Sequence, residues 1–343
     1  MSRILIIRFS ALGDVAMTVP VIYSLAKAFP MHEITVLSRE SFKPLFDKLP
    51  SNVRFIGADL SIKHRGLGGL NVLYKELKTE KYDYIADLHS VLRSRYLCLR
   101  FKLAGAGTAS IRKGRNEKKQ LTRKNNKIFD SLRSGFERYY NVFERLGFRF
   151  DLKFNSIFEN EQVNLSEITT HTGEKTDEKW LGIAPFAKHK GKIYPLELQE
   201  NVIKHFANDG RVKVFVFGGG EYEKNIIDNW TNKYPTLVSM VGKLNMSQEL
   251  VLISQLDMMY SMDSANMHLA SLVDTRVVSL WGATHPYAGF MGWNQSTDNA
   301  IQIDLPCRPC SVYGQKPCFR KDYACLYQIA PEQIIQRIEN ILF

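Results

Sequence analysis

The chain has 343 residues, which is long for a single hydrophobic core, and its composition of 45% hydrophobic and 24% charged residues is that of an ordinary soluble globular protein. The sequence contains no run of about 18 uncharged apolar residues, which excludes a membrane-spanning helix. The short apolar stretch at residues 4–7 lacks the long apolar core and the cleavage site of a signal peptide, so we expect a cytoplasmic protein.

The net charge of +11 predicts an anionic partner, and the excess charge is concentrated in one segment. Residues 112–127, RKGRNEKKQLTRKNNK, contain eight Lys or Arg residues and a single acid, Glu117. Nucleic acid, a phosphorylated lipid and a membrane surface are the partner classes that suit such a segment.

Short apolar strands alternate with helical patterns through the first half of the chain, which is typical of a parallel sheet covered on both faces. Helical patterns cover residues 21–28, 70–77 and 132–146. The expected strands are residues 3–7, 34–37, 53–56, 84–88 and 108–111.

The alternation lapses between residues 155 and 179 and then resumes, with strands expected at residues 180–185, 212–217, 237–241, 258–261, 277–280 and 300–303. We therefore predict an α/β protein with an N-terminal domain (residues 1–160), a linker (161–179) and a C-terminal domain (180–343). The amphipathic helix at residues 331–343 either stays with its own domain or packs back on the first.

Ligands of open parallel sheets bind beyond the carboxyl ends of the strands, and in the second half these positions suit an anionic ligand. Each residue group there, taken alone, has a structural explanation as a solvated loop, a tight turn or a helix cap. Their coincidence at successive strand ends favours a diphosphate site, because helix N-termini and glycine turns accommodate phosphate. The residues are Lys188, Lys190, Lys192, Gly218, Gly219, Gly220, Glu221, Glu223, Asp263, Ser264 and His268.

The first half contains neither G-x-G-x-x-G nor G-x-x-x-x-G-K-[ST], which argues against a NAD(P) enzyme and a P-loop NTPase. Asp14 follows the first expected strand, and His89 follows the fourth, with Arg93 and Arg95 one turn further on. This division predicts a donor site in the second domain, an acceptor site in the first, and chemistry in the cleft.

Four segments resemble the bacterial heptosyltransferases of glycosyltransferase family nine: SALGDV (residues 10–15), KIYP (192–195), DSANMHLA (263–270) and WGATHP (281–286). The resemblance extends from residue 4 to the terminal helix. It implies the GT-B fold, with two Rossmann-like domains facing across a cleft. It also implies an inverting, metal-independent transfer of heptose from ADP-heptose to the lipopolysaccharide inner core.

Carried onto this sequence, the resemblance makes Asp14 the general base for the acceptor hydroxyl. Lys192 and the helix N-terminus at residues 264–266 would stabilise the departing diphosphate. On the donor side it implies Lys188, Gly218, Gly219, Asp263, Ser264, Ala265, His268 and one of Glu221 and Glu223. On the acceptor side it implies Gly13, His89, Arg93, Arg112, Arg115, Lys118 and Lys119.

The sequence departs from the family pattern at two places. Ala265 stands where the family usually has the glycine of D-[TS]-G-x-x-H, and an alanine is unfavourable there if the backbone needs a positive φ. Residues 191–195, GKIYP, replace an acidic-Lys-x-Trp-Pro pattern. The resemblance therefore does not determine which sugar and which nucleobase the donor carries.

The basic segment 112–127 is either a disordered, solvated loop or a clamp for the anionic groups of the acceptor, and a mobile loop that orders on binding would satisfy both. Nucleic acid is the weaker candidate, because the segment has no interleaved aromatic residues.

Four cysteines cluster near the C-terminus: Cys307, Cys310, Cys318 and Cys325. A structural thiol cluster, a structural zinc site and disulfides are the alternatives, in that order, because only the first pair has C-x2-C spacing. None of them implies a catalytic metal, and we expect no cofactor besides an ADP-sugar as co-substrate.

The sequence therefore predicts an inverting glycosyltransferase, cytoplasmic and peripheral at the inner face of the inner membrane. Its expected partners are a nucleotide sugar and the lipopolysaccharide core or lipid A precursor, with no nucleic acid. The alternatives are a related enzyme that uses another nucleotide sugar, and a non-catalytic protein of the same fold that binds anionic lipid.

Overall fold

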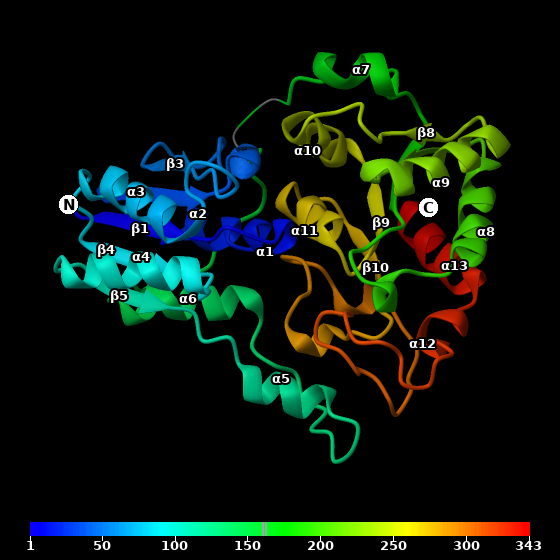
Figure 1. Ribbon diagram of the computed structural model, residues 1–343. Helices are drawn as coiled ribbons and strands as arrows, with labels where there is room; N and C mark the ends of the chain where they lie inside the picture. The colour runs from blue at the N-terminus through cyan, green and yellow to red at the C-terminus, as the bar shows by residue number, and fades with distance from the viewer. Residues whose placement is uncertain (160, 162) are drawn as a thin grey trace. The chain divides into compact units, whose positions relative to one another are not determined.

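The computed structural model describes residues 1–159, 161 and 163–343, and the chain divides into two compact units (Figure 1). Unit 1 comprises Met1–Lys113 and Ser134–Glu159, and unit 2 comprises Gly114–Arg133 and Asn160–Phe343. Each unit contains one parallel sheet, which confirms the α/β class predicted from the alternation. The expected end of the first domain, residue 160, lies outside the described residues.

Unit 1 is built on a five-stranded parallel sheet with the strand order β3-β2-β1-β4-β5. Its strands are β1 (Arg3–Ile7), β2 (Glu33–Ser38), β3 (Val53–Gly57), β4 (Tyr84–Asp87) and β5 (Gly107–Ser110). Its helices are α1 (Leu12–Ala16), α2 (Val19–Ala28), η1 (Glu40–Leu45), α3 (Gly66–Lys78), α4 (Leu92–Leu103) and α6 (Gly135–Arg145). Helices α3 and α4 bury their apolar faces against Leu5, Ile7 and Ile85 of the sheet.

Unit 2 is built on a six-stranded parallel sheet with the strand order β11-β10-β9-β6-β7-β8. Its strands are β6 (Lys179–Ala184), β7 (Val212–Val216), β8 (Val238–Ser239), β9 (Met258–Met262), β10 (Val277–Leu280) and β11 (Ala300–Ile301). Its helices are α5 (Arg115–Thr122), α7 (Ser166–Thr172), η2 (Lys190–Lys192), α8 (Leu196–Ala207), α9 (Gly220–Lys233), α10 (Met246–Gln255), α11 (Ala265–Leu272), η3 (Pro286–Ala288), η4 (Thr297–Asn299), α12 (Ala324–Tyr327) and α13 (Pro331–Leu342). The eleven strands found among the described residues all lie close to the predicted ranges.

The order of strands reverses once in each sheet. In unit 1, β2 and β3 are added on one side of β1, and β4 is added on the other side. In unit 2, β7 and β8 are added on one side of β6, and β9 on the other. The connections that follow the two central strands therefore leave in opposite directions, and the carboxyl ends of β1 and β4, and of β6 and β9, are the positions where open parallel sheets bind ligands.

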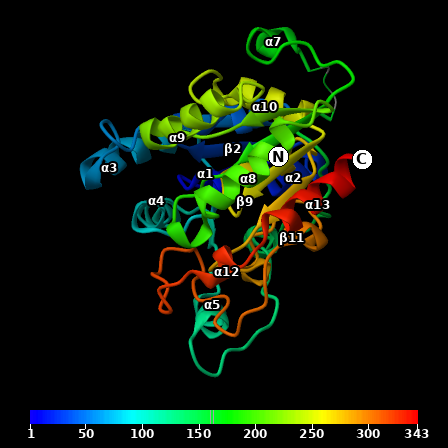
Figure 2. The same ribbon diagram turned by 90° about the vertical axis from the view of Figure 1, so that its right-hand side faces the viewer.

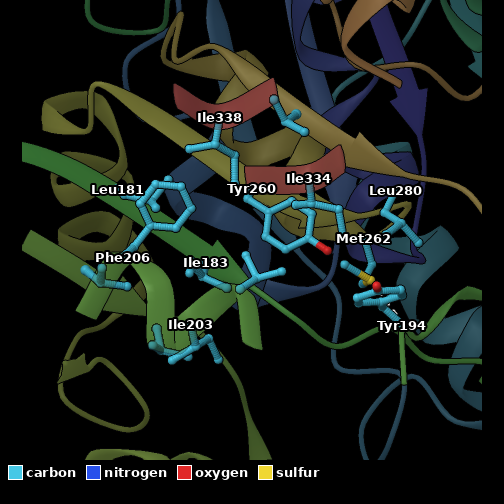
Figure 3. Close-up of a cluster of buried hydrophobic side chains, with 14 of the residues drawn as sticks. Leu181, Ile183, Tyr194, Ile203, Phe206, Tyr260, Met262, Leu280, Ile334 and Ile338 are labelled. Atoms are coloured by element: carbon cyan, nitrogen blue, oxygen red, sulfur yellow. Dashed lines mark hydrogen bonds between the residues drawn. The ribbon is translucent and has the colours of Figure 1, made fainter. Parts of the chain in front are cut away.

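The core of unit 2 extends from the sheet to the terminal helix. Figure 3 shows Leu181 and Ile183 of β6 and Tyr260 of β9 packed with Ile334 and Ile338 of α13. Helix α13 also lies beside α8 in both views of the ribbon (Figures 1 and 2). The terminal helix thus packs on the sheet of its own unit, because its apolar face completes this core.

The segment between the two sheets is more ordered than its polar sequence indicates. Within the expected linker, Ser166–Thr172 forms α7, which contacts α10. The side chain of Gln248 in α10 donates a hydrogen bond to the carbonyl of Glu167 at 3.2 Å. The weak apolar periodicity of this stretch reflects a short helix that buries only Ile168 and Thr172.

Residues 114–133, which we call the arm, belong to unit 2 although the chain on either side of them belongs to unit 1. The buried Lys118 places its ammonium 4.4 Å from the ring centre of Phe290. The Phe129 ring lies 4.9 Å from that of His285, and the backbone N–H of Leu132 donates to the Tyr287 carbonyl at 2.9 Å. The arm was expected within residues 1–160, but these contacts hold it in the second unit.

Lys127 is the anchor of the arm. Its ammonium donates hydrogen bonds to the carbonyls of three consecutive residues, Cys307 at 2.9 Å, Arg308 at 2.6 Å and Pro309 at 3.0 Å. Desolvation lowers the pKa of this ammonium from its usual value. The segment is therefore folded, with a helix and an anchored loop, rather than a disordered loop.

Replacing Lys127 with methionine keeps the length of the side chain and removes the donor for these carbonyls. A lost buried hydrogen-bond set of this kind costs about 1–3 kcal/mol, so we expect the amide hydrogens of the arm to exchange about tenfold faster or more. Hydrogen exchange followed by mass spectrometry measures this directly.

The matched control is Lys119→Met on the exposed side of α5, which should leave the exchange of the arm as in the unmodified chain. An unchanged exchange rate in Lys127→Met would contradict the anchoring role.

Candidate active site

The acid Asp14 lies at the carboxyl end of β1, in the first turn of α1. Its Oδ2 atom lies 2.6 Å from Nη2 of Arg8 and accepts a longer hydrogen bond, at 3.4 Å, from the backbone N–H of Ala11. The carboxylate thus faces back toward the start of its own helix and toward Arg8. Its side chain still keeps 32% of its surface exposed, so the group remains accessible.

Arg8 was not predicted as a site residue, although it opens the segment that contains Asp14. Its buried guanidinium also donates to the carbonyl of Leu88 at 2.7 Å and so ties the ends of β1 and β4 together. The Nε atom is buried without a hydrogen-bond partner. A guanidinium is always protonated, so Arg8 provides a fixed positive charge beside the Asp14 carboxylate.

His89 follows β4 on a turn that Asp87 stabilises. The buried Asp87 carboxylate accepts hydrogen bonds from the backbone N–H groups of His89, at 2.9 Å, and Ser90, at 2.7 Å. Nδ1 of His89 accepts a hydrogen bond from the N–H of Phe9 at 3.4 Å, which requires that this nitrogen carries no proton. The imidazole is therefore neutral, with its proton on Nε2.

The pKa of His89 agrees with this assignment. Burial lowers it to about 4, and the positive charges of Arg8, Lys113 and Arg39 add to the effect. These cations follow β1, β5 and β2, so the carboxyl edge of the first sheet is positively charged. Of the predicted acceptor residues, Arg93 and Arg112 lie in this unit and are exposed.

Lys192 and Asp263 lie at the carboxyl ends of β6 and β9 and form an ion pair. Nζ of Lys192 is 2.9 Å from Oδ2 of Asp263, and the two side chains are only 16% and 5% exposed. The pair thus lies at the strand reversal of the second sheet, as Asp14 and His89 do in the first. A lysine held in this way keeps its remaining N–H groups for a second partner.

Close packing of backbone fixes the stem of Lys192. Gly314 has a φ of 78°, and a Cβ atom there would come within 2.5 Å of Cγ of Lys192. The carbonyl of Gly191 accepts a hydrogen bond from the N–H of Ala283 at 2.8 Å. Tyr194, fully buried, donates through its hydroxyl to the Ile329 carbonyl at 2.6 Å. These contacts anchor the turn that carries Lys192 to the core of unit 2.

The N-terminus of α11 adjoins Asp263. Its N-cap, Ser264, makes no side-chain capping bond, and its hydroxyl lies instead 3.2 Å from that of Ser261. Ala265, the first helical residue, does not have a positive φ, so the alanine in place of the family glycine is compatible with this backbone. His268 lies buried in the next turn of the helix.

The glycine turn after β7 distinguishes the two candidate glutamates. Gly220 has a φ of 78°, a conformation that favours glycine. Glu223 accepts a hydrogen bond from the N–H of Gly219 at 2.7 Å and so caps its own helix, α9. Glu221 is exposed at the same turn, as is Lys188 after β6. Glu223 is therefore engaged by its own helix, and Glu221 is the more exposed of the two glutamates.

The WGATHP segment after β10 is shaped by Arg308, which the sequence did not single out. The buried guanidinium donates to the carbonyls of Gly282, at 2.6 Å, and Thr284, at 3.0 Å. His285 accepts a hydrogen bond through Nδ1 from the N–H of Tyr287 at 3.1 Å, and burial lowers its pKa to about 4. The segment is thus held by a buried cation and contains a neutral histidine next to its last residue, Pro286.

The cysteines near the C-terminus are free thiols, as is Cys98. Across the described residues, no group of three or more His, Cys, Asp or Glu side chains could hold a metal ion. Burial raises the pKa of Cys325 to about 12. Of the three alternatives for Cys307, Cys310, Cys318 and Cys325, the structure contains unpaired thiols and not disulfides.

The predicted acceptor residues are divided between the two units. Gly13, His89, Arg93 and Arg112 lie in unit 1, and Arg115, Lys118 and Lys119 lie on the arm in unit 2. Lys118 is buried against Phe290, so Arg115 and Lys119 provide the exposed charge of this helix. A cavity of about 570 Å³ at the opposite edge of the first sheet, near Tyr84 and Gly107, contains none of these residues.

The chain matches the family model described as glycosyltransferase family 9 (heptosyltransferase) over residues 71–318. The lipopolysaccharide core heptosyltransferase OpsX of Haemophilus influenzae is 25% identical over 289 residues, which cover 82% of this chain and 79% of that protein. The lipopolysaccharide heptosyltransferase 3 of Escherichia coli is 23% identical over 308 residues and covers 85% of each chain.

Solved structures show the same fold over nearly the whole chain. The glycosyl transferase family 9 protein from Veillonella parvula has a TM-score of 0.75 at 20% identity and covers 99% of this chain and 97% of its own. The ADP-heptose lipopolysaccharide heptosyltransferase II of Escherichia coli has a TM-score of 0.72 at 17% identity, covering 99% and 98%. These structural similarities confirm the GT-B class. Because the family model spans more than half of the chain, the chain belongs to glycosyltransferase family 9, the heptosyltransferases.

Proposed function

We propose that this protein transfers heptose from ADP-heptose to the inner core of lipopolysaccharide, with inversion at the anomeric carbon. The observation that carries the proposal is the matching placement of two polar pairs, Asp14 with Arg8 and Lys192 with Asp263, at the strand reversals of the two sheets. The similarity to lipopolysaccharide heptosyltransferases and to Escherichia coli WaaC, which was solved with ADP, supports this choice of substrates.

Asp14 is the general base of the proposed reaction. It takes the proton of the acceptor hydroxyl while that oxygen bonds to the anomeric carbon of the heptose. The bond from this carbon to the diphosphate oxygen breaks in the same step, and its electron pair leaves with ADP. The base must be anionic to accept the proton, and the Arg8 guanidinium lies 2.6 Å from this carboxylate and orients it.

Lys192 stabilises the charge that develops on the departing diphosphate. One of its three N–H groups is used by Asp263, and the others are available for phosphate oxygens. The N-terminus of α11 adds backbone N–H groups that no side chain caps. Glu221 meets the ribose hydroxyls, because Glu223 is used by its own helix.

The acceptor binds to the positively charged edge of unit 1. Arg93 and Arg112 contact its carboxylates and phosphates. On the arm of unit 2, the exposed Arg115 and Lys119 suit the same kind of anionic group. His89 donates a hydrogen bond to the acceptor through Nε2–H, which is the tautomer that the Phe9 hydrogen bond selects. The lipid part of such an acceptor keeps the protein peripheral at the membrane. No helix among the described residues is long and apolar enough to cross it.

A non-catalytic protein that binds anionic lipid would use the same positive edge. Such a role does not need an accessible carboxylate at its centre, since Asp14 would repel the ligand. The solvent-accessible position of the Asp14 carboxylate beside His89 therefore favours the transferase.

The Asp14→Asn variant tests the base directly. The amide keeps the size of the side chain and a hydrogen-bond acceptor for Arg8, but it cannot take a proton. We expect kcat to fall by about 10² to 10⁴ while the affinity for ADP-heptose stays nearly unchanged, measured by transfer to a core acceptor and by calorimetry.

The control for this variant is Asp47→Asn, which removes an exposed carboxylate that pairs with Lys43 in the same unit. Full activity in Asp14→Asn would refute the base assignment, and ADP-heptose binding without transfer in the unmodified protein would refute the enzyme function.

The Lys192→Met variant tests the leaving-group role. We expect transfer to fall by about 10² to 10³ and ADP to bind more weakly, because the positive charge at the diphosphate is lost. Removing one partner of a buried ion pair also costs stability, about 3–5 kcal/mol. Lys204→Met, at an exposed lysine of α8 in the same unit, is the control and should keep activity.

The double variant Lys192→Met with Asp263→Asn separates the two effects. It should recover much of the thermal stability, because Asp263 no longer carries an unpaired charge, but it should remain inactive. Recovery of both stability and transfer would show that Lys192 acts only in folding.

The neutral state of His89 makes a prediction about pH. Its pKa is about 4 in the folded protein and about 6.5 in the unfolded chain, so between these values the unfolded state binds the additional proton. Folding is then favoured above pH 6.5, and this contribution is lost as the pH falls toward 4.

Between pH 6.5 and 4, the free energy of unfolding should therefore fall less in the His89→Gln variant than in the unmodified protein. The difference between the two slopes is about 1 kcal/mol per pH unit at most, because the His89 ring keeps some contact with water. Urea unfolding at several pH values measures the difference. Parallel pH profiles of the two proteins would contradict the lowered pKa.

A further inference from the structure

Helix α4 carries leucines on the face that points away from the core. Leu92, Leu99 and Leu103 are 86%, 56% and 78% exposed. At 3.6 residues per turn these three side chains lie within about 40° of one another around the helix axis. The buried residues Leu97 and Phe101 lie on the opposite side, against the sheet. The three leucines thus lie in a row along the outermost face of the helix.

Positive charges flank this stripe on both sides. By the same helical spacing, Arg95 and Lys102 lie on one side and Arg93 and Arg100 on the other. Arg100 stacks on the ring of Tyr74 at 4.2 Å, so its long side chain lies along the helix surface. The twelve residues of α4 contain no Asp or Glu.

The adjacent surface continues the pattern. Helix α3 contacts α4 over the same face of the sheet (Figure 1). Leu67 at its start is 71% exposed, and Lys75 and Lys78 are exposed further along. Ile62, in the loop before α3, is 82% exposed. Acids are present here as well, but Glu76 is paired with Lys63 and His64.

An apolar stripe between rows of cations has a specific physical meaning. The outer face of a helix in a water-soluble domain is normally polar, because exposed leucines gain nothing from water. Leucines with flanking Arg and Lys suit the boundary of a bilayer, where apolar side chains enter the acyl region and cations meet the headgroup phosphates. A negatively charged bilayer complements this surface, because its acyl region accommodates the leucines and its headgroups attract the Arg and Lys side chains.

We propose that the α4 surface, defined by Leu92, Leu99, Leu103, Arg95 and Lys102, docks on an anionic lipid bilayer. The inference deepens the proposed function and rests on it in one respect, because a lipid-anchored acceptor lies in such a bilayer. Helix α4 begins directly after the turn of His89, so the docking surface starts beside the acceptor residues of unit 1. The bilayer would thus present the acceptor headgroup to the edge that carries Asp14.

Flotation of the full chain with lipid vesicles tests the docking surface without any donor or acceptor. We expect the protein to float with vesicles of phosphatidylethanolamine and phosphatidylglycerol and to stay unbound with pure phosphatidylcholine. The variant Leu92→Ser, Leu99→Ser and Leu103→Ser should reduce the partition coefficient about 100-fold, since each leucine contributes through its buried area. Lys78→Gln with Lys102→Gln should weaken binding and reduce its salt dependence.

The matched control replaces three apolar residues that are exposed elsewhere, as Met31→Ser, Leu165→Ser and Phe343→Ser. It should bind vesicles as the unmodified protein does. Equal binding by the α4 variant, or an equal loss in the control, overturns the proposal. A dimer of the unmodified protein that the α4 variant converts to a monomer, without vesicle binding, assigns the stripe to a second copy of the chain and also overturns it.

The outcome is independent of the transferase proposal. Vesicle binding that depends on α4, with no transfer to an acceptor in detergent, supports the docking surface and refutes only the activity. Transfer to an acceptor in detergent by a protein that does not bind anionic vesicles refutes only the docking surface.

Discussion

The reversal of strand order in a parallel sheet is the constraint on which the account of this protein depends. Connections from neighbouring strands leave to opposite sides at that point, so the carboxyl ends of the two strands are left open. In the first sheet the open ends carry Asp14 and His89, and in the second they carry Lys192 and Asp263. Two sheets of the same construction thereby offer an acid with a neutral histidine on one unit and a buried ammonium on the other.

Buried charge at these positions is stabilised by pairing and by backbone carbonyls. Arg8 pairs with Asp14 and also donates to Leu88, which joins two strands at the place where the acid is needed. Arg308 and Lys127 have no carboxylate partners among the described contacts and donate instead to carbonyls of loops. Since an unpaired buried charge is costly, these contacts fix loop conformations as well as charges.

The periodicity of the sequence was sufficient to predict all the strands, because a buried parallel strand is a short apolar run and little else produces that pattern. The residues at the strand ends could then be located, because they come directly after the predicted strands. The assignment of the arm to unit 2 could not be predicted, because Lys118 and Lys127 are two of many lysines in the sequence. Only the folded structure shows that backbone carbonyls bind Lys127 and that Lys118 lies over an aromatic ring. The role of Arg8 depends on a contact between two strands that are distant in the chain.

The central claim is that unit 2 binds the nucleotide sugar and unit 1 provides the base. Hydrogen exchange of the full chain with and without ADP-heptose tests it most directly. The account predicts that the donor protects backbone amides near Lys192, Gly219, Ser264 and Thr284 and leaves those near Arg8, Asp14 and His89 unchanged. Protection by ADP-heptose at residues 8–14 and 87–93, with none in unit 2, would contradict it.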